Sequence, residues 1–474
     1  MKRLIYSSFI ILALIGLVSC DGKLELLPNN SLETGEALQR PSDFTNAIKG
    51  VYSRFRSGNY WGGWYQTVPD VLSDNLILNS EGRNSKQTLH YWNFNGNNTW
   101  GGLWTDGYVV AYRANSILEN IEKLEAGDFR NNIEGEALGL RAMAHFDMAR
   151  VYSKLPQQAG AGDLGIPYAT TTDVTLLPNR PSVEETYTNI LADLEKAKGL
   201  IGASNGSGRL NKAAINAMLA RVYLYLQDWD KAGQAATAAI NDGGTITSRS
   251  NVGLLWKDDV EQGVNFKIKI TEKDGTAIGV NYSQTGVSGV RSEYNADYGF
   301  YQLYQDSDIR KSVYFFIGPF ANKEFIHIAK HFGKSTGSVN LVDAKLIRWE
   351  EVYLTRAEAF AELGKDVDAL ADLDAIRAER YDGFQSGNET GAALKDAIAL
   401  ERRLELAFEG HRFFDLKRRN LPISRSSFGD ESNGGGVSLP ANVLELPAGD
   451  PRFQLPIPQA ELNANPNMVQ NPGY

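Results

Sequence analysis

Apolar residues recur at helical spacing along most of the chain after residue 30. A repeat of three to four residues is typical of helices that bury one face, and Gly, Pro or Asn bounds each of these segments. The pattern predicts helices at 104–124, 131–154, 183–201, 211–241, 345–380 and 392–418. We therefore expect a mainly α protein.

The pattern changes between about residues 242 and 344. Four apolar residues from Val264 to Ile270 alternate with polar ones and lead into a Lys-Asp-Gly turn at 273–275. Alternation with a period of two indicates a strand that enters a turn. We expect short strands and irregular loops to fill this middle third.

Two helical segments resemble each other. ARVYLYLQDWDKA (220–232) aligns with AEAFAELGKDVDA (357–369), so that alanines match at two positions and Tyr223 falls on Phe360. Small residues at these positions let two antiparallel helices pack closely beside an aromatic ring, as in a tetratricopeptide-like hairpin. Any amphipathic hairpin is the alternative. The repeat predicts a helical scaffold built from segments that are far apart in sequence.

The first 20 residues, MKRLIYSSFIILALIGLVSC, have the form of an export signal. Two basic residues precede an apolar run from Leu4 to Val18, which is shorter than the ~20 residues that span a bilayer. LVSC (17–20) resembles the bacterial lipobox, which predicts acylation of Cys20 and a lipid anchor in the cell envelope. An ordinary signal peptide with an incidental cysteine is the alternative. Cys20 is the only cysteine, which excludes internal disulfides.

Composition and charge narrow the classes of protein and partner. The chain has 474 residues, 42% of them hydrophobic, and a formal net charge of −9. Such a chain folds around a large core, and we expect one large domain or two closely joined ones. A negative net charge gives no electrostatic reason to bind phosphate backbones or anionic lipid. Nucleic acid is therefore not an expected partner.

Enzyme-like motifs are present, but each stands in the wrong context. Residues 160–165 fit G-x-G-x-x-G, yet no strand precedes them and a proline follows. Residues 202–206 fit G-x-S-x-G, but they lie between two helical segments. His327 and His331 are four residues apart in a segment that alternates like a strand and supplies no third ligand. The sequence predicts no catalytic residue, no metal site and no cofactor.

Two glutamates near the C-terminus, Glu405 and Glu409, form an acidic pair in the sequence. ERRLELAFEGHRFFDLKR (401–418) places Glu405 and Glu409 one helical turn apart, a spacing that could serve acid and base in glycoside hydrolysis. Basic residues of the same segment surround the two carboxylates. We therefore expect an ion-paired helix with a structural role.

A series of segments, in this order, resembles the SusD/RagB family of outer-membrane nutrient-binding lipoproteins from Bacteroidetes. The resemblance covers essentially the whole length. Besides the lipobox, it lies in WTDGYVVAYRANSILENI (104–121), LRAMAHFDMARVY (140–152), GIPY (165–168), RWEEVYLTRAEAFAELG (348–364), residues 401–418 and LPIPQAELNANPNMVQNPGY (455–474).

The resemblance implies a SusD-like fold, mainly α, with tetratricopeptide-like helix pairs and a loop-rich face with short strands. It implies a signal peptide at 1–19, an N-terminal helical part at 20–241 and a C-terminal SusD/RagB part at 242–474, packed as one unit. It also implies a location in the outer membrane, facing outside, and a SusC-like TonB-dependent barrel transporter as the partner.

YWNFNGNNTWGGLW (91–104) places aromatic residues among Asn and Gly, which favour exposed turns. An aromatic face can lie under the C–H patch of a sugar ring, while Asn side chains bind the hydroxyls at its edge. Trp104, at the family's W-x-x-x-Y position with Tyr108, is expected to pack. Replacing an exposed ring would cost little stability. The candidates for ligand contact are Trp61, Trp64, Trp92, Asn93 and Trp100, and local packing is the alternative for each tryptophan.

The resemblance adds further candidates. Asp74, Asn75 and Arg83 lie in the segment where similar proteins often contact sugar hydroxyls. Tyr294 and Tyr298 lie in the middle third, which in this family tends to fold over the same face. The charges between residues 60 and 104 show no positive excess, which favours a neutral glycan.

These observations predict a cell-surface lipoprotein that captures oligosaccharide or polysaccharide and delivers it to the transporter, without catalysis. A RagB-like peptide-binding lipoprotein is the first alternative, because loops rich in Tyr and Trp also hold peptides. A surface glycoside hydrolase is the second.

Overall fold

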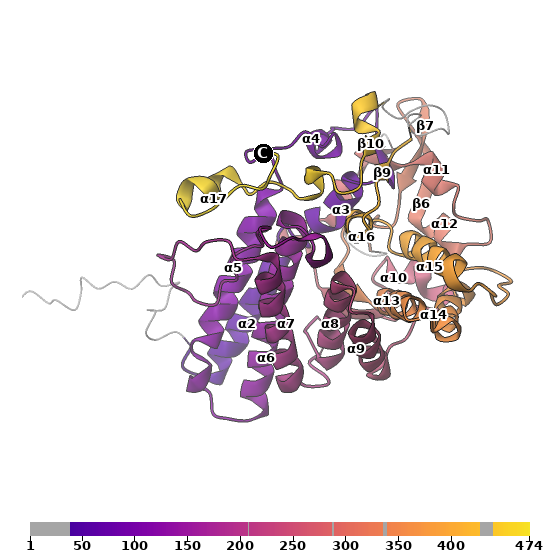
Figure 1. The fold of residues 1–474 in the computed structure, drawn as a ribbon. Coiled ribbons are helices and arrows are strands. Elements are labelled where there is room, and N and C mark those ends of the chain that lie inside the picture. The colour runs from indigo at the N-terminus through magenta and orange to yellow at the C-terminus, as the bar shows by residue number, and fades with distance from the viewer. Residues whose placement is uncertain (1–37, 207, 287–288, 335–338, 427–438) are drawn as a thin grey trace, which may run out of the picture.

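The structure is a computed structural model that describes residues 38–206, 208–286, 289–334, 339–426 and 439–474. The predicted signal peptide and Cys20 lie outside the described residues. Within them the fold is mainly α, as expected, with a few short strands (Figure 1). None of the described helices combines the length and the apolar character that crossing a bilayer requires.

The N-terminal helices form the first part of the scaffold. They are α2 (Pro41–Phe55), α3 (Trp64–Val71), α4 (Gln87–His90), α5 (Gly101–Leu118), α6 (Asp128–Tyr152), α7 (Val183–Leu200), α8 (Lys212–Leu226) and α9 (Trp229–Asn241). Helix α6 is buried along nearly all of its second half, because α5, α7 and α8 pack around it. A Cβ on Gly139 of α6 would lie 2.6 Å from Cδ1 of Ile215, so a larger residue would force that side chain of α8 to shift.

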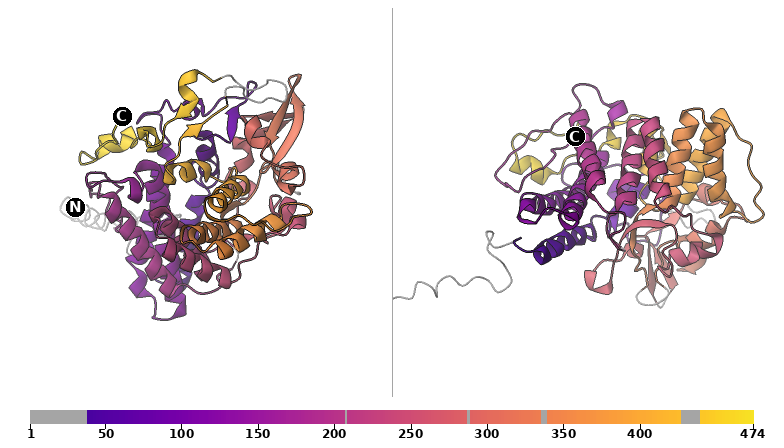
Figure 2. Two further views of the ribbon diagram at one scale, coloured as in Figure 1. Left: turned by 45° about the vertical axis from the view of Figure 1, so that its right-hand side comes forward. Right: turned by 90° about the horizontal axis from the view of Figure 1, so that it is seen from below.

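The predicted helical hairpins are confirmed. Helix α8 ends at Leu226, its C-cap Gln227 has φ 55°, and α9 folds back against α8. The second hairpin joins α13 (Trp349–Glu362) to α14 (Asp366–Ala378). The two hairpins meet because α9 packs on α13, where a Cβ on Gly233 would lie 3.1 Å from the ring of Phe360. Seen from below, these helices stand side by side, with the strands of the middle third gathered along one side (Figure 2).

Two of the predicted helices are interrupted. Ala344–Arg348 form strand β8, which pairs with β2 (Val264–Ile268), so the helix expected from residue 345 begins only at α13. The segment expected as one helix at 392–418 is split into α15 (Gly391–Glu405) and α16 (Arg412–Arg418). Phe408 and Gly410 between them have φ of 63° and 83°, which no helix allows.

The middle third contains the expected strands. Its elements are α10 (Val252–Leu255), β2, β3 (Ser283–Gly286), β4 (Gly289–Ser292), β5 (Tyr294–Ala296), α11 (Tyr298–Tyr301), α12 (Ile309–Tyr314), β6 (Phe315–Phe320), β7 (Lys323–Ile328) and β8. Strands β5, β7 and β6 form an antiparallel sheet, which β1 (Leu76–Leu78) extends by pairing Leu78 with Tyr294. A segment of the N-terminal half is thus part of the sheet of the middle third.

The C-terminal segment runs from the C-terminal half back across the N-terminal helices (Figure 1). Its elements are β9 (Ile423–Ser424), β10 (Glu445–Leu446) and α17 (Gln459–Ala464). The amide of Leu455 donates to the carbonyl of Val151 at 3.0 Å, and that of Gln459 to Gly96 at 2.8 Å. The largest cluster of buried apolar side chains runs through both halves. The boundary near residue 241 stays a prediction.

Candidate ligand-binding surface

The aromatic stretch 91–104 turns its rings inward. It follows α4, crosses a loop and enters α5, and the exposed fractions of Trp92 and Trp100 are 3% and 0%. The indole of Trp92 donates to the carbonyl of Leu72 at 2.8 Å, and that of Trp100 to Asn59 at 2.9 Å. The expectation that these rings are exposed is wrong, because the Asn residues take the outer positions of the turns.

Trp104 packs as expected. Its ring lies 5.0 Å from that of Tyr108 and 5.1 Å from that of Tyr152, measured between ring centroids, and its side chain is buried.

Trp61 also lies in the core. Its indole nitrogen donates to Asp147 at 2.9 Å, and the hydroxyls of Tyr60 and Tyr65 donate to the same carboxylate at 2.7 Å. Arg150 completes this cluster with an ion pair to Asp147 at 2.6 Å. Asp147 therefore anchors three aromatic side chains from within α6.

The polar candidates Asp74 and Asn75 are buried as well. Asp74 forms ion pairs with Arg412 at 2.7 Å and Arg403 at 3.4 Å, and Asn75 accepts from Arg403 at 2.9 Å. Burial alone would raise the pKa of Asp74, but the two guanidinium groups outweigh it and hold that pKa at about 2. Both side chains tie α3 and β1 to the C-terminal helices, so neither is presented to solvent as an open contact.

The two tyrosines of the middle third differ in exposure. Tyr294 is fully buried in β5, whereas Tyr298 is half-buried at the start of α11. Asn93 is exposed in the loop before α5. Within the described part of the chain, no hydrogen bond or ring contact joins Asn93 or Tyr298 to Trp64.

Trp64 and Arg83 remain, and Lys86 links them, because its ammonium lies over the Trp64 ring and interacts electrostatically with Arg83 and Glu293. We define the Trp64 surface as Trp64, Arg83, Lys86, Asn281 and Gln284. The Lys86 ammonium lies 4.9 Å from the centroid of the half-buried Trp64 ring and donates to Asn281 at 3.1 Å. The guanidinium of Arg83 lies 2.7 Å from the Gln284 carboxamide.

Charge at the Trp64 surface is partly neutralised, and the side chain of Lys86 is buried. Arg83, whose side chain is 46% exposed, pairs with Glu293, and Ser85 donates to the same carboxylate from its amide at 3.3 Å and its hydroxyl at 3.2 Å. Burial lowers the pKa of Lys86 to about 8. One aromatic face thus lies among an ammonium, a guanidinium and two carboxamides, which can donate to and accept from hydroxyl groups.

Sequence reasoning missed Lys86, Asn281 and Gln284. Asn281 lies beside Trp64 because Gly63 has no side chain, since a Cβ there would come within 2.8 Å of the Asn281 amide nitrogen. A glycine before a tryptophan is the only local signal, and it does not identify a partner more than 200 residues away along the chain.

Comparison with known proteins gives two family models that together match most of the chain. Residues 278–474 match the model of the SusD family, and residues 24–224 match one described as starch-binding and associating with the outer membrane. The chain belongs to the SusD/RagB family.

Individual proteins that resemble this chain are SusD-like as well. SusD-like protein P2 of Formosa agariphila is 24% identical, with 99% of both chains covered. A SusD superfamily protein from Bacteroides vulgatus ATCC 8482 is 27% identical, with a TM-score of 0.81, covering 92% of this chain and 99% of the other. Another from Bacteroides thetaiotaomicron VPI-5482 is 25% identical, with a TM-score of 0.81 and coverage of 91% and 99%.

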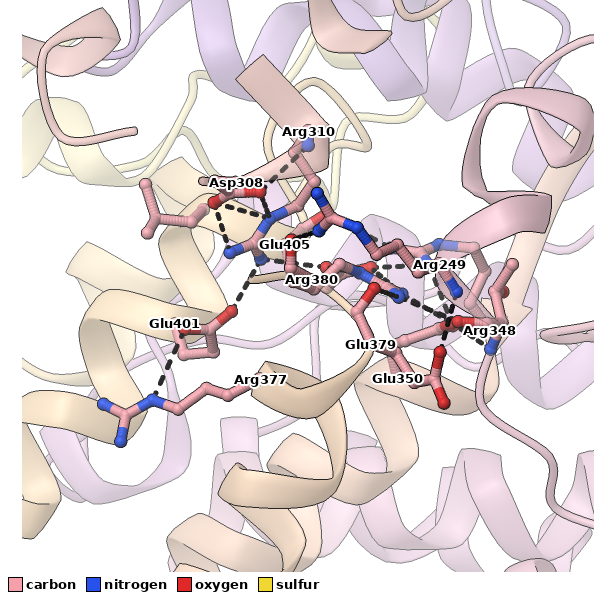
Figure 3. A network of polar contacts seen from close by, with 12 residues as sticks. Arg249, Asp308, Arg310, Arg348, Glu350, Arg377, Glu379, Arg380, Glu401 and Glu405 are labelled. Atoms are coloured by element: carbon pink, nitrogen blue, oxygen red, sulfur yellow. Dashed lines mark hydrogen bonds and ion pairs between the residues drawn. The ribbon is translucent and has the colours of Figure 1, made fainter. Parts of the chain in front are cut away.

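Glu405 of this SusD-family protein lies in a buried ion network (Figure 3), and Glu409 joins the same network through Arg348. Glu405 pairs with Arg310 and Arg348 at 2.9 Å and with Arg380 at 2.8 Å. Glu409, which lies in the break between α15 and α16 and not in a helix, pairs with Arg348 at 2.7 Å. Both carboxylates are ion-paired as expected, but their partners come from other segments and not from the basic residues of 401–418, and the single expected helix is interrupted.

The two carboxylates are held in the charged form. Burial alone would raise the pKa of Glu405, but Arg380, Arg348 and Arg310 outweigh it and hold that pKa well below its usual range. In the same way Arg348 and Lys330 hold the pKa of Glu409 at about 2. A general acid in glycoside hydrolysis needs the opposite shift, so this pair has the electrostatics of a structural element.

We expect this ion network to make folding acid-sensitive. A carboxylate whose pKa is about 2 when folded and near 4.5 when unfolded stabilises the fold above pH 4.5 and loses that contribution as the pH falls towards 2. Lowering the pH from about 6 to about 3 should reduce the free energy of unfolding by on the order of 2 kcal/mol. Urea titrations at both values test this, with Glu409→Gln expected to lose less on acidification. Equal losses would show that Glu409 is not responsible.

The two histidines have structural partners. Nδ1 of His327 is 2.7 Å from the Ser292 hydroxyl, and Nε2 of His331 is 2.8 Å from the carbonyl of Phe408. Burial lowers the pKa of His331 to about 3. Among the described residues, no group of three or more His, Cys, Asp or Glu side chains could hold a metal ion.

Proposed function

We propose that this protein is a lipid-anchored, outward-facing glycan-binding protein of the outer membrane, and that it delivers oligosaccharide to a SusC-like TonB-dependent transporter. The observation that carries the proposal is the Trp64 surface, where a half-buried indole lies among polar groups from three segments of the chain. The family model described as starch-binding and associating with the outer membrane supports it.

The chemistry of the Trp64 surface suits a sugar. The face of an indole can lie under the C–H groups of one pyranose ring, and the amides of Asn281 and Gln284 can bind hydroxyls at its edge. The charge of Arg83 is already neutralised by Glu293, which leaves Lys86 as the one ammonium of the cluster. We therefore retain a neutral glycan as the favoured ligand.

Binding without catalysis is part of the proposal. Its support is the ion pairing of Glu405 and Glu409, which keeps both carboxylates charged and occupied by arginine side chains. Release of shorter sugars from a bound oligosaccharide by the purified protein would contradict it.

Replacing Trp64 by alanine should weaken glycan binding by roughly fivefold to tenfold. Covering one face of an indole removes on the order of 50 Å² of apolar surface from water, which is worth about 1 kcal/mol. A glycan array with the wild-type protein identifies the ligand, and calorimetric titration with that ligand measures the change.

Trp229→Ala is the matched control, because Trp229 is also half-buried but lies at the start of α9. It should bind like the wild type. Equal affinities of Trp64→Ala and the wild type would exclude the Trp64 surface. If the wild type bound a peptide pool and no glycan, the peptide-binding alternative would replace the proposal.

Anchoring and transport can be tested in one fractionation experiment. Wild-type protein from detergent-solubilised outer membrane should co-purify with a TonB-dependent barrel protein, because a binding lipoprotein has no channel of its own. Cys20→Ala should abolish lipid labelling and remove the protein from the outer membrane. A lipid-labelled Cys20→Ala protein would refute the anchor, and reproducible absence of a barrel protein would refute the assembly.

A further inference from the structure

A groove lies along α5, and none of its lining residues belongs to the Trp64 surface. We define the α5 groove as the hollow of about 730 Å³ between α5, the segment 167–181 and α17. In Figure 1, α17 lies next to the end of the N-terminal helices. A volume between about 300 and 1,000 Å³ is typical of pockets that hold small ligands.

One wall of the groove is an irregular segment that the rest of the protein holds in place. Arg180 is buried and donates to the carbonyls of Gly165 at 2.7 Å and Val469 at 2.9 Å. Asn115 of α5 donates to the carbonyls of Ala169 at 3.1 Å and Thr171 at 3.0 Å. A long irregular segment fixed at several points is pre-organised, which reduces the entropy lost when a ligand binds.

This fixed segment presents apolar side chains to solvent. Val174 and Leu176 are 80% and 55% exposed, and Tyr112 on the facing helix is 47% exposed. All three line the groove. Large apolar side chains that gather at an exposed surface are typical of a binding site.

The opposite wall is a row of aromatic rings on one face of α5. Trp104, Tyr108 and Tyr112 are four residues apart, so successive side chains lie about 6 Å apart along the helix axis. The first ring is buried, the second is half-buried and the third is exposed. Trp104 therefore forms the base of the row, and Tyr108 and Tyr112 offer apolar surface to an extended ligand.

Polar groups in the groove are free to bind a ligand. The carboxamides of Asn179 and Asn189 line it, and within the described parts of the chain neither side chain forms a hydrogen bond. Three carboxylates, those of Asp173, Glu185 and Glu461, line the same space, and that of Glu461 accepts from the indole of Trp104 at 3.2 Å. Among the described residues that line the groove there is no Lys, Arg or His. This charge distribution disfavours an anionic ligand and suits hydroxyl groups, which amides and carboxylates both bind.

We propose that the α5 groove is a second glycan-binding site, which takes a neutral oligosaccharide along the row from Trp104 to Tyr112. The proposal rests on the proposed function, since it assigns a carbohydrate to the groove. Aromatic rings in a row, unpaired carboxamides and the absence of cationic lining together favour a neutral sugar chain, whose hydroxyl groups can donate to carboxylates and both donate to and accept from carboxamides.

Titration of four proteins with one neutral oligosaccharide of at least six hexose units, selected on the glycan array, tests the groove. Replacing Tyr112 by alanine removes the most exposed ring of the row and should weaken binding about fivefold. Phe129→Ala is the matched control, because Phe129 is 44% exposed at the start of α6 and does not line the groove. It should bind like the wild type. Trp64→Ala should retain binding, and its residual affinity belongs to the groove.

Hydrogen exchange locates that residual site. With saturating oligosaccharide, the amides of residues 104–112 and 167–179 in Trp64→Ala should exchange more slowly. Unchanged exchange in both segments, together with wild-type affinity in Tyr112→Ala, would overturn the groove as a glycan site and leave the proposed function intact. Absence of any glycan binding by the wild type would overturn both. Protection of these segments by apolar peptides but not by sugar would assign the groove to a peptide instead.

Discussion

Replacement of Glu405 by alanine is expected to reduce the free energy of unfolding by about 3–5 kcal/mol. Glu405 lies at the centre of the network in Figure 3 and is fully buried. Its carboxylate accepts hydrogen bonds from Arg310, Arg348 and Arg380, whose side chains are at most 1% exposed. Without this carboxylate, three buried guanidinium groups lose a counter-charge where water cannot replace it.

Urea denaturation followed by circular dichroism measures this loss. Glu405→Gln keeps the side-chain volume and one acceptor oxygen, so it should lose less than alanine and should remain folded if alanine does not. Asp306→Ala removes an ion pair with Lys311 in which the Asp306 side chain is 98% exposed, and it should leave stability nearly unchanged. A loss below about 1 kcal/mol in Glu405→Ala would mean that the network contributes little beyond its packing.

Helices were predictable where the signal is local. The expected segment 183–201 corresponds to α7 at 183–200, because its apolar residues face one side and Ser182 caps its first turn by accepting from the amide of Glu185. The two hairpins were also predictable, since small residues recur at their contacts. Periodicity and capping depend on neighbours within a few residues, and these are visible in a single sequence.

Elements that depend on distant partners were not predictable. Residues 344–348 carry an apolar pattern that continues into α13, yet they form β8 because β2, about 80 residues earlier, offers its edge. The break between α15 and α16 has the same origin. Lys330 donates to the carbonyl of Ala407 at 2.8 Å, and His331 binds the carbonyl of Phe408. These carbonyls therefore bond to side chains of a distant segment and not to amides of the same helix.

The candidate site shows the same limit. Tryptophan among Asn and Gly indicates a turn, but it does not indicate whether the ring or the backbone faces solvent. The ring of Trp64 stays half-buried at the surface, with the Lys86 ammonium that Asn281 binds lying over it, whereas the indole of Trp61 donates to the buried carboxylate of Asp147 and lies in the core. The deciding contacts come from segments between 20 and more than 200 residues away.

Replacing Trp100 by alanine should cost much stability, whereas its sequence context predicts a small loss of stability and weaker ligand binding. We expect the free energy of unfolding to fall by about 3–5 kcal/mol, because a fully buried indole leaves both a cavity and lost apolar burial. The ring lies 5.4 Å from that of Tyr65, and its nitrogen donates to Asn59, so it joins α3 to the start of α5.

The glycan affinity of the folded Trp100→Ala protein should equal that of the wild type, since the ring has no exposed face to offer a sugar. Trp64→Ala should show the opposite behaviour, with weaker glycan binding and a smaller loss of stability. Trp100→Phe should be more stable than Trp100→Ala, because the phenyl ring fills part of the cavity. Thermal melts and calorimetric titration of the three variants separate packing from recognition. A Trp100→Ala protein that melts like the wild type but binds glycan tenfold more weakly would return the 91–104 stretch to the ligand site, and it would show that the loop opens to expose the ring.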